Sequence, residues 1–518
     1  MPVNDLANTP ATGLFEQLLA AAYSTSDNHV AIVDGEACLT YSDLVHAASS
    51  FSQSLEAASV MPGDRVAVIL GNHREYLIAA FGIWKRGAVL TPLNPQLRET
   101  EIASCLLDSS ARALVTTSRN ERFIRSLRAD DVPIDHTWLW LRDAGRWMYE
   151  GIASRSATVP VDALTASADP NRPAVTQYST GSTGRPKRVT RSHGRFLGEV
   201  RSVAAVMDVT PADRILGAAP FFHSYGLVVS ALLTLLSGGT LYVLDTFLPS
   251  NVGLLVERER LSGLPAVPLM FQLLAECKQE RDFSSLRFCL SAGAPLAELT
   301  AESFATRYRK RIRRLYGSTE TGVISISYDG PGIDDGGSSV GVPIPGVSVE
   351  VVDDADRVLT AGQEGIIRVH SDFAATSYDG NCAGNDSYFT DQGFIPGDNG
   401  RIDANGELIL RGRRRNFINT HGYKVDPAEI ERALLELPGV TEAVVLGVSD
   451  GTANEQIKAV LIAPSISAQQ AVREHCIRRL APFKCPQIIE FRSELPKNLL
   501  GKVLRKYLLD ETVSAPPP

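Results

Sequence analysis

The sequence predicts an α/β protein with a large N-terminal domain and a small α+β C-terminal domain, on three observations. The 518 residues exceed what one hydrophobic core usually supports, so roughly two to four folding units are expected. Helical and extended apolar patterns alternate from about residue 40, as in parallel sheets covered by helices. A β-rich stretch and a compact α+β stretch follow. We expect a large domain over 1–411, with a β subdomain at about 340–411, and a small domain over 412–518.

The alternation is clear in the first 300 residues. The segment "YSDLVHAASSFSQSLEAA" is amphipathic, "DRVAVIL" is a short apolar strand, "EYLIAAFGIWKRG" is helical and "AVLTPLN" is extended. Strands are also expected in "RILGAAP", "TLYVLDTF" and "LRFCLSAGAPL". The most apolar stretch starts at Leu227 and is interrupted by Gly238 and Gly239, so it predicts a buried helix, a stop and a strand rather than a membrane span.

The pattern changes near Gly341, where "VSVEVVDDADRVLTAGQEGIIRVHS" predicts strands separated by turns. A hairpin is expected at Asn405–Gly406, and the arginine-rich run after it places the domain boundary near Gly412. Beyond the boundary, "PAEIERALLEL" and "AVREHCIRRL" are helical, whereas "VTEAVVLGV" and "EQIKAVLIA" are extended. This order predicts a compact α+β unit.

Composition restricts the class of function. Apolar residues make up 44% and charged residues 21% of the chain, which is typical of a globular protein. The formal net charge of -8 gives no overall attraction to nucleic acid, and "RYRKRIRR" is interpreted as a solvated helix end. Seven cysteines without a C-x-x-C pair predict reduced thiols, and the N-terminus lacks the pattern of a secretory signal. We therefore expect a cytoplasmic protein without a membrane span.

The segment "YSTGSTGRPKRVTRSH", which begins at Tyr178, carries the strongest chemical signal. Its backbone amides and hydroxyls can donate to phosphate oxygens, while Lys187 offsets their charge. It is not the G-x-x-x-x-G-K-[ST] loop, because the lysine follows proline and no hydroxyl comes after it. Local composition alone also fits a flexible linker.

Three further segments carry groups that suit a nucleotide. In "LYGSTETG", Tyr316 can stack on a purine and Glu320 can bind magnesium, which prefers hard oxygen ligands. Asp398 can accept hydrogen bonds from ribose hydroxyls, and Arg413 can bind ribose or phosphate oxygens. Lys502 lies in "LPKNLLGKVLRKYL". Taken singly, "LYGSTETG" also fits a strand-to-turn junction, Asp398 fits a turn residue and Lys502 fits a solvated side chain.

Taken in order, these segments, with "PGD" and "GRRRNFINTHGYKVDPAEIE", resemble the adenylate-forming superfamily of acyl-CoA synthetases, adenylation domains and luciferases. The resemblance extends from Leu39 to Lys506. It implies ATP-dependent conversion of a carboxylic acid to an acyl-adenylate with release of pyrophosphate, and then transfer of the acyl group to a thiol, most simply CoA. The alternatives are a stand-alone enzyme that loads a carrier-protein phosphopantetheine and a non-catalytic nucleotide or metabolite binding protein.

The resemblance also implies roles for individual residues. The expected catalytic residues are Lys502, Glu320, Lys187 and Thr183, and Glu320 and Thr183 would hold Mg²⁺. The expected ATP contacts are Thr180, Gly181, Ser182, Thr183, Gly184, Lys187, Gly293, Ala294, Pro295, Tyr316, Gly317, Ser318, Thr319, Glu320, Asp398, Arg413 and Lys502. The expected acid contacts are Phe222, His223, Ser224, Ala292, Gly293, Gly317 and Val323, and Gly422 would line the thiol tunnel.

The segment "PFFHSYGL" bears on the class of acid. The resemblance places His223 beside the reacting carboxylate, although a histidine among aromatics is also common in a core. Amino-acid-activating relatives usually have an aspartate after the aromatic residue here, and this chain has none, so an acid without an α-amine is expected. Aryl, medium-chain and short branched acids all remain open.

The chain departs from the family pattern at three positions. Ser182 replaces a threonine, Arg188 replaces a glycine after the lysine, and Arg415 stands where Asp or Lys usually marks the hinge. The resemblance further implies a mobile C-terminal domain. Its rotation would remove Lys502 after adenylation and bring Gly422 to the site.

Overall fold

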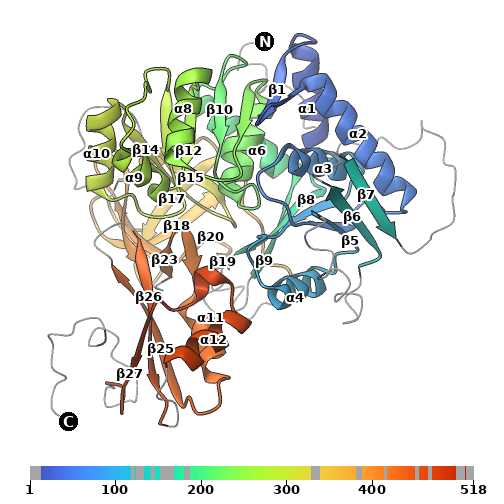
Figure 1. Ribbon diagram of the computed structural model, residues 1–518. Helices are drawn as coiled ribbons and strands as arrows, with labels where there is room; N and C mark the ends of the chain where they lie inside the picture. Colours follow the sequence, from blue (N-terminus) through green and yellow to red (C-terminus); the bar gives the residue numbers. More distant parts are fainter. Residues whose placement is uncertain are drawn as a thin grey trace.

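A computed structural model (Figure 1) describes residues 13–117, 123, 134–141, 146–151, 169–179, 187–327, 339–380, 388–413, 417–449, 454–464, 469–496 and 508. For 141, 146–151, 412, 413 and 428 it describes the backbone alone. Within these residues the predicted fold class is confirmed, because parallel strands covered by helices precede a small α+β unit.

Two large sheets with parallel central strands form most of the N-terminal part. The first sheet has the order β16 (Val342–Pro343), β15 (Gly322–Ile326), β14 (Ile312–Ser318), β13 (Phe288–Ser291), β12 (Gly263–Ala266), β10 (Arg214–Gly217), β11 (Thr240–Val243), β1 (Val30–Asp34) and β2 (Ala37–Thr40). The second has the order β7 (Arg146–Gly151), β6 (His136–Leu141), β5 (Ala113–Thr117), β3 (Arg65–Val68), β4 (Val89–Pro92), β8 (Pro173–Ser179) and β9 (Lys187–Ser192). Antiparallel pairs lie at the edges, including β14–β15 and β8–β9.

Helices cover these sheets and lie between them (Figure 1). They are α1 (Leu14–Ser24), α2 (Tyr41–Ala57), α3 (Arg74–Lys85), α4 (Glu99–Ser109), α6 (His193–Met207), α7 (Leu233–Leu236), α8 (Pro249–Glu259), α9 (Pro268–Glu276) and α10 (Glu298–Tyr308). The start of α2 is set locally by a capping box, in which Thr40 Oγ1 accepts from Asp43 N at 3.1 Å and Asp43 Oδ2 accepts from Thr40 N at 2.9 Å. Side chains of α1, α2, α3, α6 and both sheets share one apolar core.

The most apolar stretch folds as predicted. A π-helical segment (Gly226–Leu232) continues into α7, and β11 starts at Thr240 after a turn in which Gly238 has a φ of 82°. No helix in the described part of the chain is long and apolar enough to cross a membrane. The interpretation of "RYRKRIRR" was only partly right. The run does end α10, but it also enters β14, where Arg313 is buried and its Nε donates to the Ser327 carbonyl oxygen at 2.6 Å.

A separate antiparallel sheet follows, with the order β19 (Phe389–Thr390), β20 (Gly393–Phe394), β18 (Gly365–Ser371), β21 (Asp398–Ile402) and β22 (Leu408–Arg413), while β17 (Val347–Val352) pairs with β18. The predicted hairpin at Asn405–Gly406 joins β21 to β22, and Gly406 has the positive φ, 82°, that the turn requires.

The C-terminal unit has its own core. Its elements are β23 (Ile418–Thr420), β24 (Tyr423–Val425), α11 (Pro427–Leu435), β25 (Glu442–Ser449), β26 (Glu455–Ile462), α12 (Gln469–Arg479) and β27 (Ile488–Phe491). In Figure 1 this unit lies at the foot of the molecule, with α11 and α12 beside α4.

Candidate active site

A cavity of about 1350 Å³ lies where the two large sheets, the antiparallel sheet and the C-terminal unit meet. It collects predicted site residues that are far apart in the sequence. Those that line it are Lys187, Phe222, His223, Ser224, Ala292, Gly293, Ala294, Pro295, Tyr316, Gly317, Ser318, Thr319, Glu320, Val323, Asp398 and Gly422.

The other predicted site residues stay predictions. Thr180, Gly181, Ser182, Thr183, Gly184 and Lys502 lie outside the described residues, as does Arg415. The backbone of Arg413 is described, and its position in β22 pairs with Asp398 in β21. This register places Arg413 one strand away from a residue that lines the cavity.

Tyr316 and Asp398 form one end of the cavity. The Tyr316 hydroxyl donates to Asp398 Oδ2 at 2.6 Å, which joins the β14–β15 hairpin to the start of β21. Gly317 permits the tight hairpin, because a Cβ at this position would lie 2.6 Å from the Gly322 carbonyl oxygen. An aromatic ring and a buried carboxylate are thus held side by side at this end.

Glu320 and Lys187 form a second group, and both are buried. Glu320 Oε1 accepts from the Tyr378 hydroxyl at 2.8 Å. Lys187 Nζ lies 3.6 Å from the ring centre of Tyr388 and 4.5 Å from that of Tyr378, which are cation–π distances. Within the described part of the chain Lys187 forms no ion pair, so its charge is available to an anionic ligand.

Sequence reasoning missed Tyr378. It lies 58 residues after Glu320, in a short "SYDG" stretch that is typical of an ordinary turn. The tertiary structure shows that this stretch runs beside β9, because Val189 and Tyr378 form an isolated bridge and the Asp379 backbone N donates to the Arg188 carbonyl oxygen at 2.8 Å. No local signal in the sequence could have identified it.

His223 and its neighbours form the third group, after β10. The His223 ring is exposed to the cavity rather than packed in a core, and its centre lies 4.5 Å from that of Phe222. The cavity walls around the ring desolvate it, and this desolvation, together with the charge of Lys424, lowers the pKa of His223 to about 4. The imidazole is therefore neutral near pH 7. Ser224 Oγ donates to Gln177 Oε1 at 2.6 Å, which ties this segment to β8.

A buried ion pair supports the wall behind these groups. Arg191 Nη1 lies 2.6 Å from Glu199 Oε2, and both side chains are 1% exposed. Glu199 Oε1 accepts from the backbone N of Val323 at 2.9 Å, so the pair fixes β15 where it lines the cavity. The pair was not predicted, because both residues look like ordinary surface charges in the sequence.

Gly422 lies on the side of the cavity formed by the C-terminal unit, in the turn between β23 and β24. Its φ is 85°, and a Cβ there would lie 3.5 Å from Val267 Cγ2. The C-terminal unit is held against the large domain nearby, since the Tyr423 hydroxyl donates to Gln96 Oε1 at 2.6 Å. In this arrangement Gly422 is presented to the cavity.

A buried lysine makes a second contact between the two parts. Lys484 Nζ donates to Glu101 Oε1 on α4 at 2.6 Å and to Glu429 Oε1 on α11 at 2.7 Å. Arg98 Nε donates to the Leu480 carbonyl oxygen at 3.0 Å. The N-terminal end of α4 is therefore the docking point of the C-terminal unit.

Comparison with known proteins finds matches over most of the chain. Residues 19–379 match the family described as AMP-binding enzyme, and residues 429–502 match the AMP-binding enzyme C-terminal domain. A feruloyl-CoA synthase from an Amycolatopsis species is 31% identical over 492 residues, which cover 93% of this chain and 95% of the relative. The long-chain-fatty-acid–CoA ligase FadD13 of Mycobacterium tuberculosis is 30% identical over 480 residues, 91% of this chain and 93% of the relative.

Solved structures show the same architecture. A double mutant of o-succinylbenzoate CoA synthetase from Bacillus subtilis, bound with the product analogue OSB-NCoA, has a TM-score of 0.84 and 26% identity, and the match covers 95% of this chain and 98% of that one. ATP-bound MatB from Rhodopseudomonas palustris has a TM-score of 0.69 and 27% identity, covering 96% and 98%.

Proposed function

This chain belongs to the AMP-binding enzyme family, and from that premise we propose that it converts a carboxylic acid to an acyl-adenylate and transfers the acyl group to CoA. The observation that supports the proposal most directly is that one cavity is lined by Lys187, Glu320, His223 and Gly422. The cation of Lys187 suits phosphates, and the carboxylate of Glu320 suits a metal ion. The neutral imidazole of His223 suits a substrate carboxylate, and Gly422, which has no side chain, suits a thiol arm.

ATP would lie along the first two groups of residues. Tyr316 would stack on adenine, with the "GAP" segment at Gly293 beside it, and Asp398 would accept from the ribose hydroxyls. The hydrogen bond from Tyr316 to Asp398 keeps the carboxylate in place before the nucleotide arrives. Lys187 would meet the phosphates, together with the loop from Thr180 to Gly184.

Glu320 is the residue in the described site that best fits Mg²⁺. Mg²⁺ is usually held by one or two carboxylates, with substrate phosphates and water completing the shell, and Glu320 is a buried carboxylate on the same wall as Lys187. The Tyr378 hydroxyl orients this carboxylate. A bound Mg²⁺ would offset negative charge on the phosphates, and Thr183 would be its second protein ligand.

The first half-reaction joins the acid to AMP. A carboxylate oxygen of the substrate attacks the α-phosphorus of ATP, a new P–O bond forms, and the bond to pyrophosphate breaks. His223 and Ser224 would position the carboxylate, and the neutral imidazole would do so without a competing charge. Lys502 would stabilise the charge that develops on the transferring phosphoryl group. The absence of an aspartate beside Phe222 supports an acid without an α-amine.

The second half-reaction releases AMP. The thiol sulfur attacks the acyl carbon, the bond to the AMP oxygen breaks, and a thioester forms. Gly422 and Val267 both line the cavity, and the missing side chain of Gly422 would leave its backbone open to a pantetheine arm. The contacts of Tyr423 and Lys484 hold this arrangement, which we assign to thiol transfer. Lys502 would act in the other arrangement, after rotation of the C-terminal unit.

A panel of aryl, medium-chain and short branched acids tests the proposal by pyrophosphate release, with and without CoA. We expect release that depends on one class of acid, and a thioester when CoA is added. Acid-dependent release without a CoA thioester would instead support loading of a carrier-protein phosphopantetheine. Absence of acid-dependent release across all three classes would contradict the proposed activity and support a non-catalytic binding protein.

A further inference from the structure

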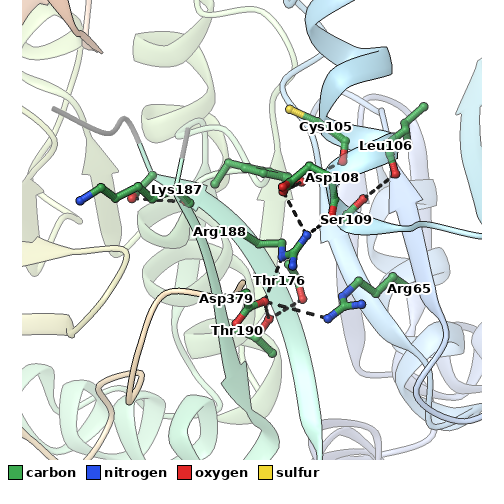
Figure 2. A network of polar contacts seen from close by, with 12 residues as sticks. Arg65, Cys105, Leu106, Asp108, Ser109, Thr176, Lys187, Arg188, Thr190 and Asp379 are labelled. Carbon is green, nitrogen blue, oxygen red and sulfur yellow. Dashed lines mark hydrogen bonds and ion pairs between the residues drawn. The ribbon is translucent and has the colours of Figure 1, made fainter. Parts of the chain in front are cut away.

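Arg188 follows Lys187 on β9 and joins two segments that are remote from it in the sequence. Its Nε lies 3.1 Å from Asp379 Oδ2, and its Nη1 lies 3.0 Å from Asp108 Oδ2 and also donates to the Asp108 carbonyl oxygen. Asp108 belongs to the last turn of α4 (Figure 2). The largely buried guanidinium therefore connects β9 with both α4 and residues 378–380.

Asp379 is held from several directions. Its Oδ2 accepts from Thr190 Oγ1 at 2.6 Å, and its backbone N donates to the Arg188 carbonyl oxygen at 2.8 Å. Arg65 Nη2 is 4.0 Å from the same Oδ2, so Arg188 approaches this carboxylate more closely than Arg65 does. These contacts fix the short segment against β9 by its side chain and by its backbone (Figure 2).

The geometry of extended chains links this network to the cavity. Successive side chains of a strand point to opposite sides. Lys187 and Arg188 accordingly diverge in Figure 2, and Lys187 lines the cavity. The bridge between Val189 and Tyr378 aligns the opposing segment, in which Tyr378 lines the cavity while Asp379 meets Arg188.

Tyr378 is the residue through which the network reaches the site. Its hydroxyl donates to Glu320 Oε1 at 2.8 Å, and its ring lies 4.5 Å from Lys187 Nζ. A shift of the segment would therefore move a hydrogen-bond donor of Glu320 and an aromatic neighbour of Lys187 together. Arg188 acts on both without touching either side chain.

We propose, on the basis of the proposed function, that Arg188 is a positioning residue for adenylation. By tying Asp379 to β9 and to α4, Arg188 holds Tyr378 where it orients Glu320 and packs against Lys187. Small displacements of binding groups lower reaction rates steeply. Because Glu320 and Lys187 are the groups proposed to bind MgATP, loss of Arg188 should impair the use of MgATP. Among the described residues, the network meets α4 at Asp108, whereas the C-terminal unit docks near the other end of this helix through Glu101, and no contact of the network reaches His223 or Gly422.

Two substitutions test the proposal. Arg188→Met removes the charge but keeps an unbranched apolar stem, and Arg188→Lys keeps a charge that can reach one carboxylate. For each variant, steady-state pyrophosphate release is titrated separately with MgATP, with free Mg²⁺ and with the acid. Thiol transfer from chemically supplied acyl-adenylate and the melting temperature are measured in parallel. Arg65→Met is the control, since it removes the more distant arginine at the same carboxylate.

We expect Arg188→Met to raise the KM for MgATP and the half-saturating Mg²⁺ concentration by about tenfold, the scale of one lost charged hydrogen bond. The KM for the acid and the rate of thiol transfer should stay within about twofold of wild type, because the network does not reach those subsites. Arg188→Lys should recover most of the loss, and Arg65→Met should show little change.

Two results would overturn the proposal while leaving the proposed function intact. One is a wild-type KM for MgATP in Arg188→Met. The other is an equal fall in ATP use, acid use and thiol transfer, with a lower melting temperature and no recovery in Arg188→Lys, since this is the behaviour of a residue that only stabilises the fold. If wild-type protein shows no acid-dependent pyrophosphate release, the proposed function fails first and this proposal fails with it.

Discussion

Two buried lysines that line the cavity have opposite surroundings. Lys187 is 4% exposed and lies over the rings of Tyr388 and Tyr378, and among the described residues it forms no ion pair. Lys484 is 6% exposed and lies between the carboxylates of Glu101 and Glu429, both within 2.7 Å.

The difference in charge compensation distinguishes Lys187, a binding group, from Lys484, a structural group. A buried charge is unfavourable unless an opposite charge compensates it. The charge of Lys484 is compensated within the protein, so this lysine joins the C-terminal unit to α4. Among the described residues only aromatic rings lie against the charge of Lys187, so its full electrostatic partner is expected to be a ligand, such as the phosphates of ATP.

The largest expected effect is that of Lys187→Met. Loss of one electrostatic contact to the reacting phosphates should lower the rate of adenylation by roughly 10²- to 10³-fold. Single-turnover pyrophosphate release measures this rate. Lys85→Met is a matched control, because Lys85 Nζ also lies over an aromatic ring, 5.0 Å from the centre of Phe15, but does not line the cavity. A loss of the same size in both variants would contradict the assignment.

Gly422→Leu should impair the other side of the cavity. The added side chain would project toward Val267 and block the thiol path, so transfer from supplied acyl-adenylate should fall by about 100-fold while adenylation changes little. Gly406→Leu controls for backbone strain, since its φ of 82° is close to the 85° of Gly422 and no atom lies within 4 Å of its notional Cβ. Equal damage to both half-reactions in Gly422→Leu would argue against separate arrangements for the two steps.

Lys484→Met should have a moderate effect. It leaves Glu101 and Glu429 facing each other without a cation, which should favour undocking of the C-terminal unit and slow thiol transfer by about tenfold, with adenylation preserved. Adding Glu101→Gln should restore part of the rate, because it removes the repulsion. If thiol transfer is unchanged in Lys484→Met, docking at α4 does not support that step.

The same contact predicts a pH dependence. Burial disfavours the ammonium of Lys484, but Glu429 and Glu101 outweigh it and raise its pKa above the ordinary 10.5. The contribution of this pKa shift to folding stability is therefore complete below pH 10.5 and is lost as the pH rises through the raised value. Unfolding free energies of wild type and Lys484→Met should converge at strongly alkaline pH. A constant difference across that range would contradict the pKa shift.

The smallest expected effect concerns His223. Burial and Lys424 lower its pKa from 6.5 to about 4, so the ring should stay neutral and acid binding should show no titration between pH 5.5 and 8. The sign for stability is the reverse of that for Lys484. The unfolded chain takes up a proton below pH 6.5, so this group lowers stability as the pH falls from 6.5 toward 4. Imidazole NMR chemical shifts, assigned with His223→Asn, measure the pKa directly, and a value near 6.5 would contradict the described enclosure.

The sequence by itself was sufficient for the fold class and for many candidate site residues. Alternating periodicity predicted the sheets and helices because side-chain period is a local property of each element. Tyr316, Glu320 and Asp398 were predicted because each lies in a short motif whose residue types suit a nucleotide, and Gly422 was implied by the resemblance to the adenylate-forming superfamily; all four line the cavity.

Tertiary structure alone decided which side chains contact one another. Tyr378 meets Glu320, Arg191 meets Glu199, and Lys484 reaches Glu101 across 383 residues, yet none of these pairings has a local signature. Lys187 and Lys484 show why. The sequence presents both as ordinary lysines, and only burial, with aromatic rings around one and carboxylates around the other, leaves the first charge for a ligand and neutralises the second. Whether a buried charge is compensated depends on distances between segments that are remote in the sequence, and the order of residues does not give these distances.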